Sequence, residues 1–190
     1  MLRRRALVIA ILGLVALPRL AWADDYARQT LLLLRILAYD RNLKERAGPN
    51  VNILILYRKG DTNSERARAG LKTALDAVVI GKLNVSGLPV SIVERQFGSI
   101  EEVSQQLAQS RFAALFVCEG LEKEIPAIAQ RTRRSSVLSF IASESGVRAG
   151  ISVGLVYATP KVRILVNRDA VLAEGVRFDA GLLRVAEIVR

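Results

Sequence analysis

The chain has 190 residues, of which 51% are hydrophobic but only 5% aromatic, and it carries a formal net charge of +10. It contains no histidine and one cysteine, Cys118, which excludes an imidazole base, a histidine-ligated metal and an intramolecular disulfide. No aromatic residues interleave the basic ones as base-stacking platforms would, so the composition argues against a nucleic-acid-binding protein. We expect no cofactor and no metal.

The first 23 residues have the three-part pattern of a secretory signal peptide. A basic start at residues 3–5 precedes an apolar run from Ala6 to Leu17, and small residues flank Trp22 before Asp24. The run is shorter than the roughly 20 residues that span a bilayer. We therefore expect a leader over residues 1–23, export to the periplasm, and no integral membrane anchor after cleavage.

Residues 24–190 are long enough for one domain with a sizeable, mostly aliphatic core. Their hydrophobic periodicity alternates between the helical and the strand pattern. In chain order, the sequence predicts helix 26–47, strand 51–57, helix 62–79, strand 88–94, helix 99–111, strand 112–118, helix 121–134, strand 137–142, strands 151–157 and 162–166, and helices 168–174 and 180–189.

Local signals support several of these boundaries. Thr62 with Glu65, and Ser99 with Glu102, have the spacing of capping boxes. Residues 51–57 form a near-continuous aliphatic run, typical of a strand covered on both faces. The short connection 158–161 predicts an antiparallel hairpin. The expected fold class is therefore α/β: a three-layer sandwich with a mixed, mostly parallel sheet, a C-terminal antiparallel hairpin and helices on both faces.

In such a sheet, ligands and partners dock beyond the carboxyl ends of the parallel strands. Three loops are expected there, and they supply the candidate ligand or partner residues. These residues are Gly60, Asp61, Thr62, Asn63 and Ser64 in the first loop, Glu119 in the second, and Ser143 and Glu144 in the third. The first loop offers backbone donors and a helix N-terminus to a small anion. The alternative is that Thr62 and Ser143 only cap helices and that the glycine only forms a turn.

Two further segments are candidates for a partner or dimer surface. Leu31, Leu32 and Leu34 belong to four consecutive leucines, more than one buried stripe requires, although burial on two sides of the helix would also account for them. Arg131, Arg133 and Arg134 cluster at a helix C-terminus, where cations favour the helix dipole and could also contact an acidic partner. Cys118 ends an apolar run, which indicates a buried thiol.

The last third of the chain resembles the YfiR/HmsC-like family of exported bacterial regulators. The residues that carry the resemblance are Val137-Leu138-Ser139, Gly150-Ile151, residues 163–167 with Ala170 and Ala173, Gly175-Val176-Arg177-Phe178, and residues 182–186. Some relatives use disulfides, and the lone Cys118 departs from that pattern. Asn167 is the most distinctive matching polar residue, and we expect it to cap the helix that follows.

The resemblance implies a non-catalytic protein that binds the periplasmic domain of an inner-membrane diguanylate cyclase, or of a sensor kinase, and represses it. It implies a role in cyclic-di-GMP signalling and biofilm regulation, and we expect a homodimer. An alternative of a different class is a small-ligand receptor similar to one lobe of a solute-binding protein. The layered sheet and the loop at residues 60–64 favour that alternative.

Overall fold

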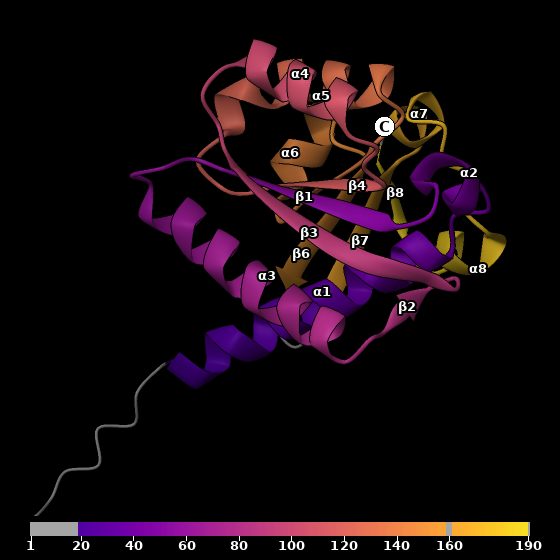
Figure 1. Cartoon of the computed structure of the whole chain (residues 1–190), viewed down its shortest axis with the longest axis horizontal. Helices are drawn as coiled ribbons and strands as arrows, with labels where there is room; N and C mark the ends of the chain where they lie inside the picture. The colour runs from indigo at the N-terminus through magenta and orange to yellow at the C-terminus, as the bar shows by residue number, and fades with distance from the viewer. Residues whose placement is uncertain (1–18, 159–160, 190) are drawn as a thin grey trace, which may run out of the picture.

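The computed structural model describes residues 19–158 and 161–189, and Figure 1 shows their arrangement as a central sheet between two helical layers. The sheet has eight strands in the order β2-β3-β1-β4-β5-β6-β7-β8. The strands are β1 (Val51–Tyr57), β2 (Asn84–Val85), β3 (Leu88–Gln96), β4 (Ala114–Val117), β5 (Leu138–Ile141), β6 (Val153–Ala158), β7 (Lys161–Asn167) and β8 (Glu187–Val189).

The five strands from β3 to β6 in this order run parallel, and β7 pairs antiparallel with β6. The sheet ends in two short strands, β2 antiparallel to β3 and β8 parallel to β7. The predicted fold class is therefore confirmed, including the hairpin after the parallel strands.

The helices cover both faces of the sheet, with α1 and α3 on one side and α4, α5 and α6 on the other (Figure 1). Alternate side chains of β1 serve the two sides: Ile53 and Ile55 enter one core, and Leu54 and Leu56 enter the other. The helices are α1 (Arg19–Ala38), α2 (Leu43–Ala47), α3 (Thr62–Ile80), α4 (Ile100–Gln109), the 3-10 turn η1 (Glu122–Glu124), α5 (Ile125–Arg134), α6 (Glu144–Arg148), α7 (Arg168–Ala173) and α8 (Ala180–Leu183).

Side-chain caps fix the starts of several helices. The Ser99 side chain accepts the N–H of Glu102 at the start of α4, and the Asn167 side chain accepts the N–H of Ala170 at the start of α7, as predicted. The cap of α3 is Asp61 rather than the predicted Thr62, which is the first residue inside the helix. The carboxylate of Asp61 accepts the N–H of Ser64 at 2.8 Å.

The predicted long helix 26–47 is wrong, because the chain leaves helical geometry between α1 and α2. The buried carboxylate of Asp40 causes the break. Its Oδ1 accepts the N–H groups of Asn42 and Arg177 at 3.0 Å each, and its Oδ2 accepts Nη2 of Arg46 at 2.7 Å. These bonds require a turn at Asp40, which side-chain periodicity cannot reveal.

The same turn contacts a segment that is distant in the sequence, residues 177–179. Asp40 forms an isolated antiparallel bridge with Phe178, and the N–H of Asp179 donates to the Tyr39 carbonyl at 2.9 Å. The N–H of Arg41 donates to the Arg177 carbonyl at 2.9 Å. We refer to these contacts between residues 39–46 and 176–179 as the terminal clasp.

The predicted C-terminal helix 180–189 is also wrong beyond Leu183. The helix α8 has one turn, and residues 187–189 form strand β8 beside β7. The pairing partner lies in β7, so the hydrogen bonds that select a strand here are non-local.

The charged and apolar parts of the predicted leader lie outside the described residues, and α1 begins within its last residues, at Arg19. Over the ranges 19–158 and 161–189, no helix has the length and apolar character needed to cross a membrane.

Candidate functional site

The connections of the parallel strands reverse direction between β1 and β4, which is where ligands bind in sheets of this type. Here the side chain of Arg58, which follows β1, links the loop after β1 to the loop after β4. Nε of Arg58 donates to the Gly120 carbonyl and Nη2 donates to Oε1 of Glu124, each at 2.6 Å. Gly120 has φ +82°, and a Cβ there would lie 2.9 Å from Cγ of Asp61. The loops after β1 and β4 are therefore brought together, as expected, but they fill the reversal point themselves.

Most polar groups of the loop Gly60–Ser64 serve the fold. The buried Oγ of Ser64 accepts the N–H of Arg58 at 2.8 Å, and the N–H of Gly60 donates to Oε1 of Glu65 at 2.9 Å. Thr62 and Asn63 are exposed. A partner at this loop would therefore meet the exposed side chains rather than a ring of free backbone donors.

The two candidate residues of the third predicted loop, Ser143 and Glu144, have different roles. Ser143 caps α6 by accepting the N–H of Gly146 at 3.2 Å. Glu144 turns toward β7, where Arg163 donates to its Oε2 at 3.1 Å, and Arg148 donates to its Oε1 at 2.8 Å. These arginines hold the pKa of Glu144 below its ordinary value. Glu144 thus belongs to a charged cluster over β7 and β8, not to the loops near β1.

The leucine segment is divided between core and surface. Leu34 is buried in the core together with Leu33, so Leu34 cannot contribute to a partner surface. Leu32 is partly buried, and Leu31 is 58% exposed. The arginines 131, 133 and 134 occupy the last turn of α5 as predicted, and Nη2 of Arg133 donates to the Gly150 carbonyl at 3.2 Å.

A cavity that the sequence did not predict lies at the carboxyl edge of the sheet, under the start of α1. Its volume is about 280 Å³. Residues from α1, α3, β4, β6 and two loops line it: Asp25, Tyr26, Gln29, Ala67, Phe116, Glu119, Ala142, Val156 and Tyr157. Of these, only Glu119 was among the predicted site residues. We call this space the α1 cavity.

Polar groups of the α1 cavity have shifted acidities. Burial raises the pKa of Glu119, and the carboxylates of Glu122 and Asp61 raise it further. Burial and the neighbouring carboxylate of Asp25 raise the pKa of Tyr157 to about 12. The Tyr157 hydroxyl donates to the backbone carbonyl of Asp25, which ties α1 to β6. Perturbed groups that converge on one concave space mark a candidate binding site.

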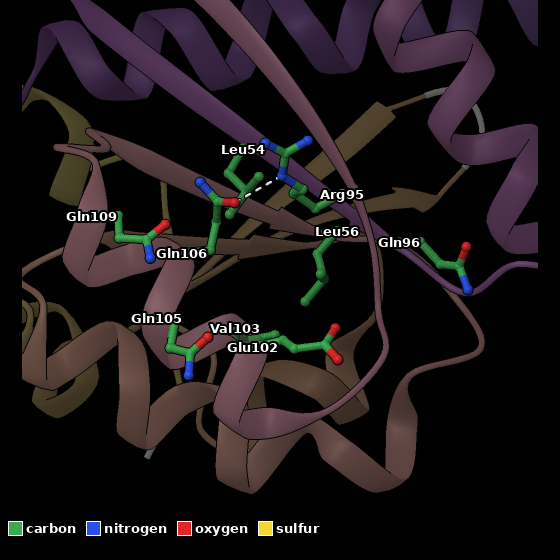
Figure 2. Close-up of a pocket in the computed structure, with 9 residues that line it drawn as sticks. All are labelled: Leu54, Leu56, Arg95, Gln96, Glu102, Val103, Gln105, Gln106 and Gln109. Atoms are coloured by element: carbon green, nitrogen blue, oxygen red, sulfur yellow. Dashed lines mark hydrogen bonds between the residues drawn. The ribbon is translucent and has the colours of Figure 1, made fainter.

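A second cavity, of about 260 Å³, lies on the other face between β3 and α4. Figure 2 shows its floor of Leu54 and Leu56, and the bond from Nε of Arg95 to Oε1 of Gln106 at 2.7 Å. Its other polar side chains come from the exposed or partly exposed positions 96, 102, 105 and 109. Because these side chains are exposed, whereas the α1 cavity gathers groups whose pKa values are raised by burial, we regard the α1 cavity as the better candidate.

Deep in the molecule, Glu174 receives hydrogen bonds from neutral groups only. Its Oε1 accepts the hydroxyls of Thr132 at 2.6 Å and Ser139 at 2.7 Å. Its Oε2 accepts the Ser139 N–H at 3.0 Å and the Ser152 hydroxyl at 2.5 Å. Because the carboxylate is fully buried and all these donors belong to the protein, this cluster joins α5 and β5 to the residue before β6 and the residue after α7 rather than forming a ligand site.

Within the part of the chain that the structure describes, no group of three or more His, Cys, Asp or Glu residues could hold a metal ion. The lone thiol of Cys118 is buried directly after β4, and burial raises its pKa.

The fold is an α/β fold similar to that of solute-binding-like domains. A ligand-free, open substrate-binding protein with adhesive properties from Clostridium difficile is similar with a TM-score of 0.58 and 16% identity over 78% of this chain. An ABC domain in complex with L-Trp from Streptococcus pneumonia is similar with a TM-score of 0.55 and 14% identity over 81% of this chain. A conserved domain protein from Vibrio cholerae is similar with a TM-score of 0.62 and 13% identity over 87% of this chain. The chain spans 57%, 62% and 60% of their respective lengths, and at these identities the likeness shows the fold alone.

The family model described as YfiR/HmsC-like matches residues 26–187, so the chain belongs to the YfiR/HmsC-like family, as the resemblance in its last third predicted. This membership supports a role as a periplasmic regulator. A comparison with curated proteins gives no significant match.

Proposed function

We propose that the protein is an exported, non-catalytic regulator that docks on the periplasmic domain of an inner-membrane signalling protein, a diguanylate cyclase, and represses it. The observation that carries this proposal is the family match over residues 26–187. The regulator binds the inactive conformation of its partner more tightly than the active one and shifts the population toward the inactive state.

The chemistry of the chain supports a binding role. The sequence has no histidine, and its one thiol is buried with a raised pKa, so it supplies neither an imidazole base nor an accessible thiolate. The buried carboxylate of Glu174 is enclosed by the protein's own hydroxyls. These features favour recognition over turnover.

The experiment is a deletion of the gene in its native host, with cellular cyclic-di-GMP and biofilm mass as readouts, together with capture of membrane proteins by the tagged protein after periplasmic cross-linking. We expect higher cyclic-di-GMP in the deletion strain and capture of a membrane cyclase. Unchanged cyclic-di-GMP together with no captured cyclase or kinase would refute the proposal.

Among the four consecutive leucines 31–34 of α1, Leu31 is the exposed one and can reach a partner, because Leu33 and Leu34 enter the core and Leu32 packs against it. We expect Leu31→Asp to weaken capture of the cyclase at least about tenfold, since an apolar interface residue becomes a charge. Leu172→Asp on α7 is a matched control, because Leu172 is 57% exposed and Leu31 is 58% exposed. Equal effects of the two changes would rule out the α1 surface.

Sedimentation of both variants separates loss of partner binding from loss of self-association. The proposed homodimer predicts a wild-type mass of two chains. If Leu31→Asp yields a monomer that still captures the cyclase, the leucine serves the dimer instead of the partner.

A further inference from the structure

A hydrogen-bond donor at the α1 cavity has no partner among the residues that the structure describes. Gln29 lines the cavity with an exposed fraction of 1%, and its buried Nε2 has no hydrogen-bond partner among the described residues. A buried amide without a partner destabilises the fold, because it has lost its hydrogen bonds to water without a replacement. The amide of Gln29 is therefore available to an oxygen acceptor that the described residues do not supply.

The charged side chains that line the cavity are acidic. The carboxylates of Asp25 and Glu119 line it. Arg66 lies close enough to lower the pKa of Glu119, but Glu122 and Asp61 act in the opposite direction and more strongly. An anion entering here would meet like charges, whereas a cation would be attracted.

Aromatic rings form much of the remaining wall. Phe116 closes the bottom from β4, and Tyr157 and Tyr26 come from β6 and α1. The Tyr26 ring is held in place by α3, because a Cβ on Gly70 would lie 2.1 Å from Cδ2 of that ring. Rings of this kind attract an ammonium group through their negative faces.

We propose that the α1 cavity binds a small organic ammonium ion that also carries an oxygen acceptor. The carboxylates and the aromatic rings receive the ammonium group, and the amide of Gln29 donates to the oxygen. A volume of about 280 Å³ suits a molecule of amino-acid size. This inference goes beyond the regulatory role and does not depend on it.

The test compares three probes that share a phenol ring and differ in charge: tyramine (cation), tyrosol (neutral) and 4-hydroxyphenylacetate (anion). Binding to the purified full chain is measured by isothermal titration calorimetry. We expect tyramine to bind at least about tenfold more tightly than tyrosol and the anion to bind more weakly still. Equal affinities, a preference for the anion, or no binding of any probe would overturn the proposal.

The ammonium group can come from a free amine or from a lysine side chain of a protein. Nα-acetyl-lysine amide serves as the probe for the second source. Tighter binding of tyramine assigns the site to a free amine, and tighter binding of the lysine probe assigns it to a protein side chain. Either result supports an ammonium site.

Two variants locate the site. Glu119→Gln removes one charge without changing shape, and we expect it to reduce the preference for tyramine over tyrosol at least about fivefold. Gln29→Leu removes the unused donor, and we expect it to keep the fold and to lose the preference for tyramine over phenethylamine, which lacks the oxygen. Glu101→Gln, at an exposed position of α4, is the matched control and should leave all affinities unchanged. If Glu119→Gln and Glu101→Gln behave alike, the ligand does not contact the α1 cavity.

Discussion

At the scale of single residues, the buried carboxylates of Asp40 and Glu174 are stabilised in different ways. Asp40 is paired with a guanidinium, while the donors to Glu174 are three hydroxyls and one backbone N–H. Neutral donors compensate burial only in part, and burial raises the pKa of Glu174 above its ordinary value of 4.5.

The raised pKa of Glu174 makes stability depend on pH. The folded state holds the proton of Glu174 more tightly than the unfolded state. The stabilisation that this protonated carboxyl gives the folded state is therefore fully present below about pH 4.5 and is lost as pH rises through the folded pKa. We therefore expect the difference in free energy of unfolding, wild type minus Glu174→Gln, to fall with rising pH by at most about 1.4 kcal/mol per unit. Urea denaturation from pH 4 to pH 8 measures it, and a difference that stays constant over this range contradicts the assignment.

The Asp40–Arg46 pair should behave as a unit. Arg46 Nε and Nη2 bind Oδ2 of Asp40, and Nη1 binds the carbonyls of Ala113 and Ser136, so removal of Asp40 leaves a buried, partly unpaired guanidinium. We expect Asp40→Asn to lower the free energy of unfolding by about 3–5 kcal/mol. In a double-mutant cycle, Arg46→Met should lower the free energy of unfolding much less in the Asp40→Asn background than in the wild type.

The exposed pair Arg41–Asp179 provides the comparison, because it joins the same two segments at the surface. Arg41→Ala should have a clearly smaller effect than Asp40→Asn in the same denaturation series. Similar losses would mean that the segment itself, and not the buried charge, determines stability.

The sequence predicted several helix caps, because a cap depends on the side chain at one position and on the helix directly after it. Ser99 and Asn167 have the side chains that cap helices, and their positions follow from the hydrophobic pattern beside them. Gln29 and Glu174 could not be predicted in this way. Each lies in a helical or turn segment where a polar residue normally faces water, and only the packing of distant elements buries it.

At the scale of elements, β1 was predicted to the residue because seven consecutive mostly aliphatic residues fit only a strand covered on both faces. The structure of residues 184–189 was not predicted correctly. Residues 185–188 can follow either a helical or a strand pattern, and the open edge of β7 selects the strand. The α1 cavity was missed for a related reason, since its residues come from four elements and two loops that are spread along the sequence.

Close packing between α6 and β6 gives a prediction at this scale. A Cβ on Gly154 would lie 2.6 Å from Cγ2 of Val147 and 3.3 Å from Cβ of Leu165. We expect Gly154→Ala to lower the free energy of unfolding by about 1–3 kcal/mol, because α6 must shift away from the sheet. Adding Val147→Ala removes the first clash, so the double variant should lose less than the sum of the two single variants, and strict additivity would contradict this explanation.

At the scale of the whole molecule, the single thiol reports on global unfolding. Cys118 is buried after the central strand β4, and its N–H donates to the Leu56 carbonyl of β1. We expect labelling by a thiol reagent to be about 10³-fold or more slower in the native protein than in denaturant, because the thiol reacts only after the sheet opens. Absorbance with an aromatic disulfide reagent measures the rate, and fast labelling of the native chain would show local opening at β4.

The terminal clasp has a consequence for how the chain reaches its native state. Since residues 39–46 find hydrogen-bond partners at residues 176–179, this segment cannot complete its contacts until residues 176–179 have left the ribosome. A long wait of this kind raises the entropic cost of closing the loop and delays completion of the structure. A chain emerging from the ribosome in order would thus stay incompletely folded until its residues 176–179 are available.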